Sequence, residues 1–170
     1  PGFSKTALQP ETLDQMVGDI ERLKSRYHQD TPDALRRVVV APTTPTFSLP
    51  PTLLRELAHT ARGLGLRLHT HLSETQNYVN FCREKYNCLP VEFVAEHEWL
   101  GPDVWFAHAV HLQPGEIRML AQTGTGISHC PVSNARLGSG VAPVPQMFEA
   151  GVAISLGVDG VASNESGSMV

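Results

Sequence analysis

The sequence predicts an α/β fold that forms part of a (β/α)8 barrel. Short apolar runs alternate with helical patterns, and five such runs are centred near residues 39, 68, 106, 128 and 155. This spacing is close to the roughly 30 residues per strand–helix unit of a barrel with about 250 residues. Polar residues follow four successive runs, at the strand ends where barrel enzymes place their active sites. A chain of 170 residues therefore supplies about five of the eight units.

The first half of the chain predicts two helices around one strand. A helix begins near Gln9-Pro10-Glu11, with Pro in its first turn, and places an apolar core-facing stripe at helical spacing. That stripe is Leu13, Met16, Val17, Ile20 and Leu23. The β-branched run 37–41 predicts a buried strand that leads into a Pro-rich loop, 42–51. The next helix ends at Gly63 and Gly65, and its apolar face is Leu53, Leu54, Leu57, Ala58 and Ala61.

The second half of the chain repeats the order of strand, loop and helix. The predicted strands are 66–71, 104–108, 126–129 and 152–158. The predicted helices are 74–86, 91–96, 114–121 and 143–150. Residues 130–140 are expected to form a polar loop, because they are rich in Ser, Asn and Gly.

An open doubly wound sheet uses the same alternation and would be complete at this length. Such a sheet usually shows a Gly-rich first turn, whereas the pair Gly124 and Gly126 precedes its strand. Periodicity alone leaves both architectures open. The polar residues at four strand ends favour the barrel.

Composition excludes several classes of protein. Hydrophobic residues make up 41% and charged residues 18%, with no long apolar run, so disordered and membrane-spanning classes are excluded. A net charge of −4 without a basic stripe argues against nucleic acid as a partner. Cys82, Cys88 and Cys130 are an odd number without CxxC spacing, which indicates a reducing, cytoplasmic setting. The chain starts at Pro1 without an initiator Met, so we expect a fragment that lacks both ends.

The first strand-end group is His69-Thr70-His71-Leu72-Ser73-Glu74. Alternation places His69 and His71 on one face of the strand. A neutral imidazole is a good zinc or iron ligand, and Glu74 lies close enough beyond the strand end to act as a proton shuttle. The alternative for an isolated HxH pair is two hydrogen-bonded histidines near a sheet edge.

Three further strands end in polar residues. His108 ends one apolar run, and Asp159 ends another, where a buried carboxylate must be paired or metal-bound. Ser133 and Asn134 lie in the polar segment after the run near residue 128. Each group alone has a structural explanation, such as a helix cap at Asp159. Together they favour a metal-assisted hydrolytic site.

Four motifs carry a family resemblance: LHTHLSET (68–75), WFAHAVHL (105–112), TGTGISHCPVSNARLGSG (123–140) and LGVDGVASNES (156–166). In this order and spacing the sequence resembles the amidohydrolase superfamily, in its branch of cytosine and guanine deaminases and chlorotriazine hydrolases. The details look most similar to 8-oxoguanine and isoxanthopterin deaminases. The resemblance implies hydrolytic deamination of a pterin or purine ring.

The resemblance also implies a role for each site residue. His71 would be a metal ligand, Glu74 the proton shuttle, and Asp159 both a ligand and the base. His108 would contact the hydrolytic water or the substrate. The metal would be zinc, with iron as the alternative. The candidate ring contacts are Tyr78, Ser133, Asn134 and Arg136.

By the same resemblance, residues 1–170 are the C-terminal portion of a catalytic barrel, about strands 4 to 8. The family's first-strand HxH motif and its flanking β-sandwich are absent from this chain, so the chain alone is expected to be inactive. The implied partners are a small heterocyclic substrate and water, and the full-length protein would be a homo-oligomer.

Three other functions remain open. The same site in a chlorotriazine-type hydrolase would release chloride or an alkylamine. An adenosine-deaminase-like enzyme would need room for a ribose. A non-catalytic barrel fragment is the alternative from a different class, and the presence of His71, Glu74, His108 and Asp159 argues against it.

Overall fold

The computed structural model describes residues 11–164 and 167. The chain divides into two compact units, residues 1–38 and 39–170. Among the described residues, every helix is too short or too polar to cross a membrane.

The described part of the first unit contains one helix, α1 (Leu13–Tyr27). The helix begins after Thr12, whose hydroxyl accepts a hydrogen bond from the Gln15 N–H while the Gln15 side chain accepts one from the Thr12 N–H. The predicted start at Gln9 and Pro10 lies outside the described residues. The predicted apolar stripe of α1 is only half-buried, because the described part of this unit has no second helix or strand to enclose it.

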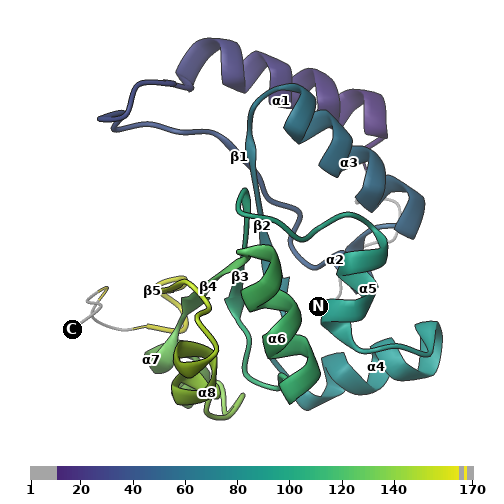
Figure 1. Ribbon diagram of the computed structural model, residues 1–170. Coiled ribbons are helices and arrows are strands. Elements are labelled where there is room, and N and C mark those ends of the chain that lie inside the picture. The colour runs from purple at the N-terminus through teal and green to yellow at the C-terminus, as the bar shows by residue number, and fades with distance from the viewer. Residues whose placement is uncertain (1–10, 165–166, 168–170) are drawn as a thin grey trace. The chain divides into compact units, whose positions relative to one another are not determined.

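The second unit is built on a five-stranded parallel sheet (Figure 1). Its strands are β1 (Val39–Val40), β2 (Arg67–Leu72), β3 (Val104–His108), β4 (Gly126–His129) and β5 (Ile154–Leu156). They pair in sequence order, β1-β2-β3-β4-β5, with no reversal. A doubly wound sheet would reverse at a switch point, so the barrel prediction is confirmed over the doubly wound alternative. With right-handed crossovers, this order puts all connecting helices on one face of the sheet.

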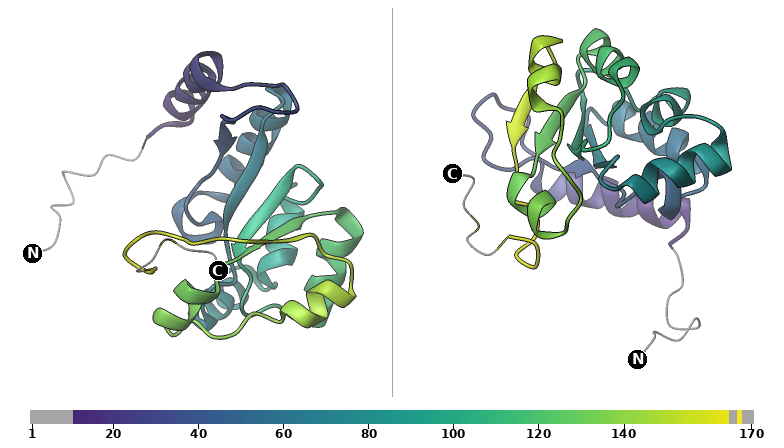
Figure 2. Two further views of the ribbon diagram at one scale, coloured as in Figure 1. Left: turned by 90° about the vertical axis from the view of Figure 1, so that its left-hand side faces the viewer. Right: turned by 90° about the horizontal axis from the view of Figure 1, so that it is seen from below.

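In the described residues of the second unit, seven helices connect successive strands (Figure 2). They are α2 (Pro45–Ser48), α3 (Pro51–Gly63), α4 (Gln76–Tyr86), α5 (Pro90–Glu96), α6 (Pro114–Thr123), α7 (Pro131–Arg136) and α8 (Val144–Glu149). Two of them correct the sequence prediction, because α2 lies in the expected loop 42–51 and α7 in the expected loop 130–140. Both begin with proline in the first turn, where its fixed φ and missing N–H favour a helix start.

The alternation along β2 defines the two faces of the sheet. Leu68, Thr70 and Leu72 are buried, while Arg67 is exposed and His69 and His71 are half-buried. Phe106 and Ile127 continue the buried row on β3 and β4, because each pairs in register with the row begun by Thr70. One face of the sheet therefore packs in the core, and the other face carries the histidines.

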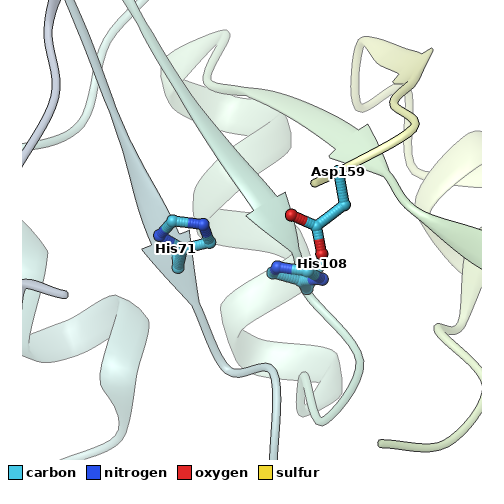
Figure 3. A group of neighbouring side chains, drawn as sticks. All are labelled: His71, His108 and Asp159. Atoms are coloured by element: carbon cyan, nitrogen blue, oxygen red, sulfur yellow. The ribbon is translucent and has the colours of Figure 1, made fainter. Parts of the chain in front are cut away.

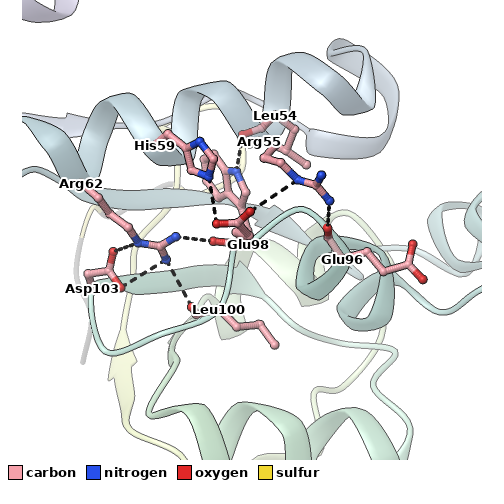
Figure 4. Close-up of polar contacts among 9 residues, drawn as sticks. Leu54, Arg55, His59, Arg62, Glu96, Glu98, Leu100 and Asp103 are labelled. Atoms are coloured by element: carbon pink, nitrogen blue, oxygen red, sulfur yellow. Dashed lines mark hydrogen bonds and ion pairs between the residues drawn. The ribbon is translucent and has the colours of Figure 1, made fainter.

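The amino ends of the central strands are held by a polar cluster between α3 and the segment 96–103 (Figure 4). Arg62 donates to the Asp103 carboxylate at 2.9 Å and to the Glu98 carbonyl at 2.7 Å. His59 pairs with the Glu98 carboxylate at 2.9 Å, and the buried Trp99 indole donates to the Leu54 carbonyl at 2.7 Å. These contacts stabilise the end of the sheet opposite the polar strand ends, which in barrels is the stability face.

A buried carboxylate joins two helix starts near the other end of the sheet. Glu116 is 1% exposed and accepts hydrogen bonds from the Val91 N–H of α5 at 2.9 Å and the Gln113 N–H before α6 at 2.8 Å. Burial raises the pKa of Glu116. The two hydrogen bonds satisfy N–H groups that have no partner within their own helices.

Replacement of Glu116 by Ala leaves both N–H groups without that acceptor. We expect Glu116→Ala to lower the free energy of unfolding by about 2–4 kcal/mol, measured by urea denaturation of the complete gene product that carries this chain. Glu92→Ala is the matched control, because Glu92 is exposed and accepts from the N–H of Leu89 at the start of its own helix. Its cost should be about 1 kcal/mol or less. Equal losses in the two variants would contradict the role given to Glu116.

Candidate active site

Side chains from three strand ends converge at the carboxyl edge of the sheet. They are His71 on β2, His108 on β3 and Asp159 after β5 (Figure 3). One possible ligand atom from each residue lies within 4.8 Å of the other two. The sequence predicted that polar strand ends would meet at one site, and the structure brings these three residues together.

His71 is oriented by the loop that follows β1. Its Nδ1–H donates to the Thr43 carbonyl oxygen at 2.5 Å. The proton on Nδ1 leaves a lone pair on Nε2, the arrangement that second-sphere carbonyls impose on metal-binding histidines. The ring stacks against His108 with 5.4 Å between ring centroids.

His108 reaches the site through an unusual backbone conformation. Regular alternation along β3 would place it on the Phe106 face, but its φ is +72°, in the left-handed region. This conformation breaks the alternation and lets the ring lie beside His71. Its Nδ1–H donates to the Asn134 side-chain oxygen at 2.9 Å. The ring is almost fully buried, with 1% exposure of the residue.

Left-handed backbone recurs around the site. Ser73, Ala109 and Asp159 have φ values of +50°, +51° and +60°. The Ser73 carbonyl accepts from the N–H groups of Val110 and His111 at 3.1 and 3.0 Å, which fixes the loop after β2 to the loop after β3. Such conformations cost free energy in non-glycine residues and cluster at functional sites.

Glu74 follows the left-handed Ser73 and turns toward His108. Its Oε2 lies 3.8 Å from His108 Nε2, and its side chain is 27% exposed. The carboxylate is thus next to the histidine nitrogen that Asn134 leaves unbound, and it remains accessible from outside. A shuttle needs both properties, because it must exchange protons with a bound molecule.

Asp159 is held by three hydrogen bonds. The hydroxyls of Ser133 and Ser163 donate to Oδ2 at 2.5 and 2.9 Å, and the Gly160 N–H donates to Oδ1 at 2.8 Å. The residue is exposed rather than buried as the sequence predicted, because the segment after β5 leaves it at the surface. Partial desolvation of the carboxyl group acts to raise the pKa of Asp159, but these hydrogen bonds outweigh it and hold the pKa below its ordinary value. The group is therefore an ionised carboxylate with a fixed orientation.

His69 does not join the cluster, although it shares a face with His71. Its Nδ1–H donates to the Trp105 carbonyl at 3.1 Å, and its ring stacks on the Trp105 ring with centroids 4.8 Å apart. Burial lowers the pKa of His69. His69 is thus a hydrogen-bonded structural histidine, as in the alternative interpretation of the HxH pair, while His71 lies in the site.

Three of the four candidate ring contacts lie on α7, and the fourth lies on α4. Ser133 and Asn134 are buried and hydrogen-bond to Asp159 and His108. Arg136 is exposed at the end of α7. Tyr78 is buried on α4, where its ring meets Phe47 edge-on at 5.2 Å and burial raises its pKa.

Two contributors were not predicted from the sequence. Thr43 acts through a backbone carbonyl, which carries no side-chain signal. Ser163 lies in a segment whose Ser and Asn residues had no assigned role, and only its contact with Asp159 identifies it. Ser163 lies seven residues beyond the end of β5, too far for the pattern of polar strand ends to indicate it.

The donor set fits a divalent metal. His71 and His108 offer imidazole nitrogens and Asp159 offers an ionised carboxylate, a combination of nitrogen and oxygen ligands that suits zinc and iron. The Thr43 carbonyl and the Ser133 hydroxyl supply the outer hydrogen bonds that such ligands usually make.

Comparison with known proteins gives the family. The model of the amidohydrolase family matches residues 6–170. The chain therefore belongs to the amidohydrolase family.

Two relatives indicate the branch. The chain is 58% identical over 165 residues to an isoxanthopterin deaminase from an unknown prokaryotic organism, covering 97% of this chain and 34% of the relative. It is 42% identical over 166 residues to an 8-oxoguanine deaminase of Pseudomonas aeruginosa, covering 98% of this chain and 36% of the relative. The chain thus spans about a third of the length of these relatives.

Solved structures share the fold. An amidohydrolase from an environmental sample of the Sargasso Sea matches with a TM-score of 0.83 and 53% identity, over 98% of this chain and 35% of that one. Atrazine chlorohydrolase from Arthrobacter aurescens, complexed with zinc, matches with a TM-score of 0.87 and 31% identity, over 98% and 36%. The second unit is thus part of an amidohydrolase barrel.

The geometry distinguishes the two histidines of β2. We expect His71→Ala to lower zinc affinity in the complete gene product by more than the roughly 10–100-fold that loss of an outer hydrogen-bond partner costs. His69→Ala is the control, because His69 lies on the same strand and face but outside the donor cluster. Zinc per folded protein is measured by metal analysis after dialysis against a weak chelator. Equal zinc retention in the two variants would contradict the assignment of His71.

Proposed function

We propose that the protein carrying this chain is a metal-dependent aminohydrolase that deaminates a pterin or purine ring, such as isoxanthopterin or 8-oxoguanine. The observation that carries the proposal is the convergence of His71, Glu74, His108 and Asp159 at one edge of an amidohydrolase sheet. Relatives at 58% and 42% identity that deaminate such rings support the substrate class.

His71 and Asp159 are the proposed metal ligands, and zinc is the proposed metal, with iron as the alternative. A divalent metal supplies, when bound, a strong nucleophile from water at neutral pH. The zinc in the related atrazine chlorohydrolase supports this choice. The fixed tautomer of His71 and the ionised carboxylate of Asp159 support their part in it.

The proposed roles of Asp159, Glu74 and His108 in the reaction follow from where their side chains lie in the site. Asp159 accepts the proton that water loses as its oxygen attacks the ring carbon bearing the amino group. Glu74 delivers a proton to the neighbouring ring nitrogen. His108 contacts the attacking water or the substrate oxygen through Nε2, which faces Glu74. Asp159 then gives its proton to the amino nitrogen, the carbon–nitrogen bond breaks, and ammonia leaves. The hydroxyl proton on the former water oxygen passes to Glu74, so the ring keeps a carbonyl oxygen.

Three further features belong to the proposal. Arg136, exposed at the end of α7, is a candidate contact for a ring oxygen. A cytoplasmic setting is supported by the three free cysteines, Cys82, Cys88 and Cys130. A homo-oligomer of the full-length protein is supported by the family resemblance of the four sequence motifs.

The substrate class is tested on the complete gene product, expressed with zinc. Ammonia release is followed in parallel on isoxanthopterin, 8-oxoguanine, guanine and adenosine, and chloride release on a chlorotriazine. We expect ammonia from isoxanthopterin or 8-oxoguanine. Ammonia from adenosine alone would show that the substrate is a nucleoside and not a free pterin or purine ring. Chloride from the triazine without any ammonia would replace deamination by dehalogenation.

Glu74→Gln tests the proton shuttle separately from the metal. The variant removes a titratable group but no proposed ligand, so we expect zinc content to stay unchanged and kcat to fall by about 10²–10⁴-fold. Glu84→Gln serves as the control, because Glu84 is exposed on α4 and should leave kcat unchanged. A Glu74→Gln enzyme with nearly normal turnover would rule out the shuttle.

A further inference from the structure

Two adjacent residues of α7 each hold a different member of the site. Ser133 donates to Asp159 Oδ2 at 2.5 Å, and Asn134 accepts from His108 Nδ1–H at 2.9 Å. Both residues are almost fully buried, at 1% and 2% exposure. Their partners come from different strands, so this one short helix connects the end of β3 with the segment after β5.

Hydrogen bonds on both sides of the pair fix the backbone of α7. The Asn134 N–H donates to the Cys130 carbonyl, and the Leu137 N–H donates to the Ser133 carbonyl, each at 2.9 Å. The Asn134 carbonyl accepts from the Ser139 N–H at 2.9 Å. The two side chains therefore project from a backbone that is pinned before, at and after them.

The Ser133 contact restricts the carboxylate. Ser133 and Ser163 bind the same oxygen, Oδ2, while the Gly160 N–H binds Oδ1. An ionised carboxylate only accepts hydrogen bonds, so these three donors together restrict its rotation. Loss of Ser133 would remove one of the three donors that orient Asp159 without removing the carboxylate.

The Asn134 contact selects a tautomer. A side-chain carbonyl oxygen only accepts, so His108 must carry its hydrogen on Nδ1, and Nε2 faces Glu74 at 3.8 Å. The amide nitrogen of Asn134 is buried and has no hydrogen-bond partner among the described residues. An unpaired buried donor lowers the stability of the fold. The benefit of an amide at this position is therefore the acceptor oxygen that it gives to His108.

We propose that Ser133 and Asn134 are positioning residues with separate tasks. Ser133 orients Asp159 for the metal, and Asn134 keeps His108 in the Nδ1–H tautomer with Nε2 toward Glu74. This inference rests on the proposed function. Both residues act by orienting other side chains of the site, and neither contacts the substrate ring.

The test uses four variants of the complete gene product: Ser133→Ala, Asn134→Leu, Asn134→Asp and the control Val132→Ala. Leu and Asp match the size of Asn134, but only Asp keeps the acceptor oxygen. Val132 lies on the same helix and is 48% exposed. The readouts are zinc affinity by chelator competition, kcat and KM on the ring that the wild type turns over, melting temperature, and the His108 tautomer by ¹⁵N NMR.

The expected results differ between the neighbours. Ser133→Ala should weaken zinc binding by about 10–100-fold. Asn134→Leu should keep zinc affinity and KM but lose about 10–100-fold in kcat, with loss of the Nδ1–H signature of His108. Asn134→Asp should keep that signature and recover most of kcat. Val132→Ala should change none of these quantities.

Several results would overturn the inference. A rise in KM at constant kcat for Asn134→Leu would make Asn134 a substrate contact, and equal damage in the Leu and Asp variants would remove the role of the acceptor. Unchanged zinc affinity in Ser133→Ala would remove the role of Ser133. If the wild type turns over none of the rings, the proposed function fails, whereas zinc affinity and the tautomer still decide this inference.

Discussion

The parallel pairing of five strands in sequence order is the constraint on which the site depends. Because every strand runs in the same direction, every strand delivers the residues after it to the same edge of the sheet. His71, His108 and Asp159 are separated by up to 88 residues in sequence and still meet within a few ångströms. The opposite edge carries the Arg62 and Glu98 contacts, so stabilisation and chemistry occupy different ends of the same strands.

The sheet alone does not orient the side chains. His108 enters the site through a left-handed backbone, and Asp159 is also left-handed, so both depend on neighbours that offset the conformational cost. Two neighbouring residues of α7 hold them by hydrogen bonds, Asn134 to His108 and Ser133 to Asp159. His71 is held in the same way by the carbonyl of Thr43. Each site residue is thus oriented by a residue from the connection that follows a neighbouring strand.

The sequence predicted the parts of this arrangement that depend on periodicity. The five strands and the polar residues at their ends follow from apolar runs, and β3 and β4 were predicted with the observed limits. It did not predict α7, because Ser133 and Asn134 are typical loop residues whose helix is stabilised by Pro131 and by tertiary contacts. Strand alternation would place His108 on the same face as Phe106. Its left-handed backbone, which moves it off that face, depends on tertiary packing and cannot be predicted from the local sequence pattern.

We propose that these strand ends together form one metal-dependent hydrolytic centre. The most direct measurement is an anomalous difference map at the zinc edge, from crystals of the complete gene product grown with zinc. We expect a strong peak at about 2.0–2.2 Å from His71 Nε2 and from an oxygen of the Asp159 carboxylate. A zinc peak elsewhere in the barrel, with His71 and Asp159 outside its coordination sphere, would contradict it.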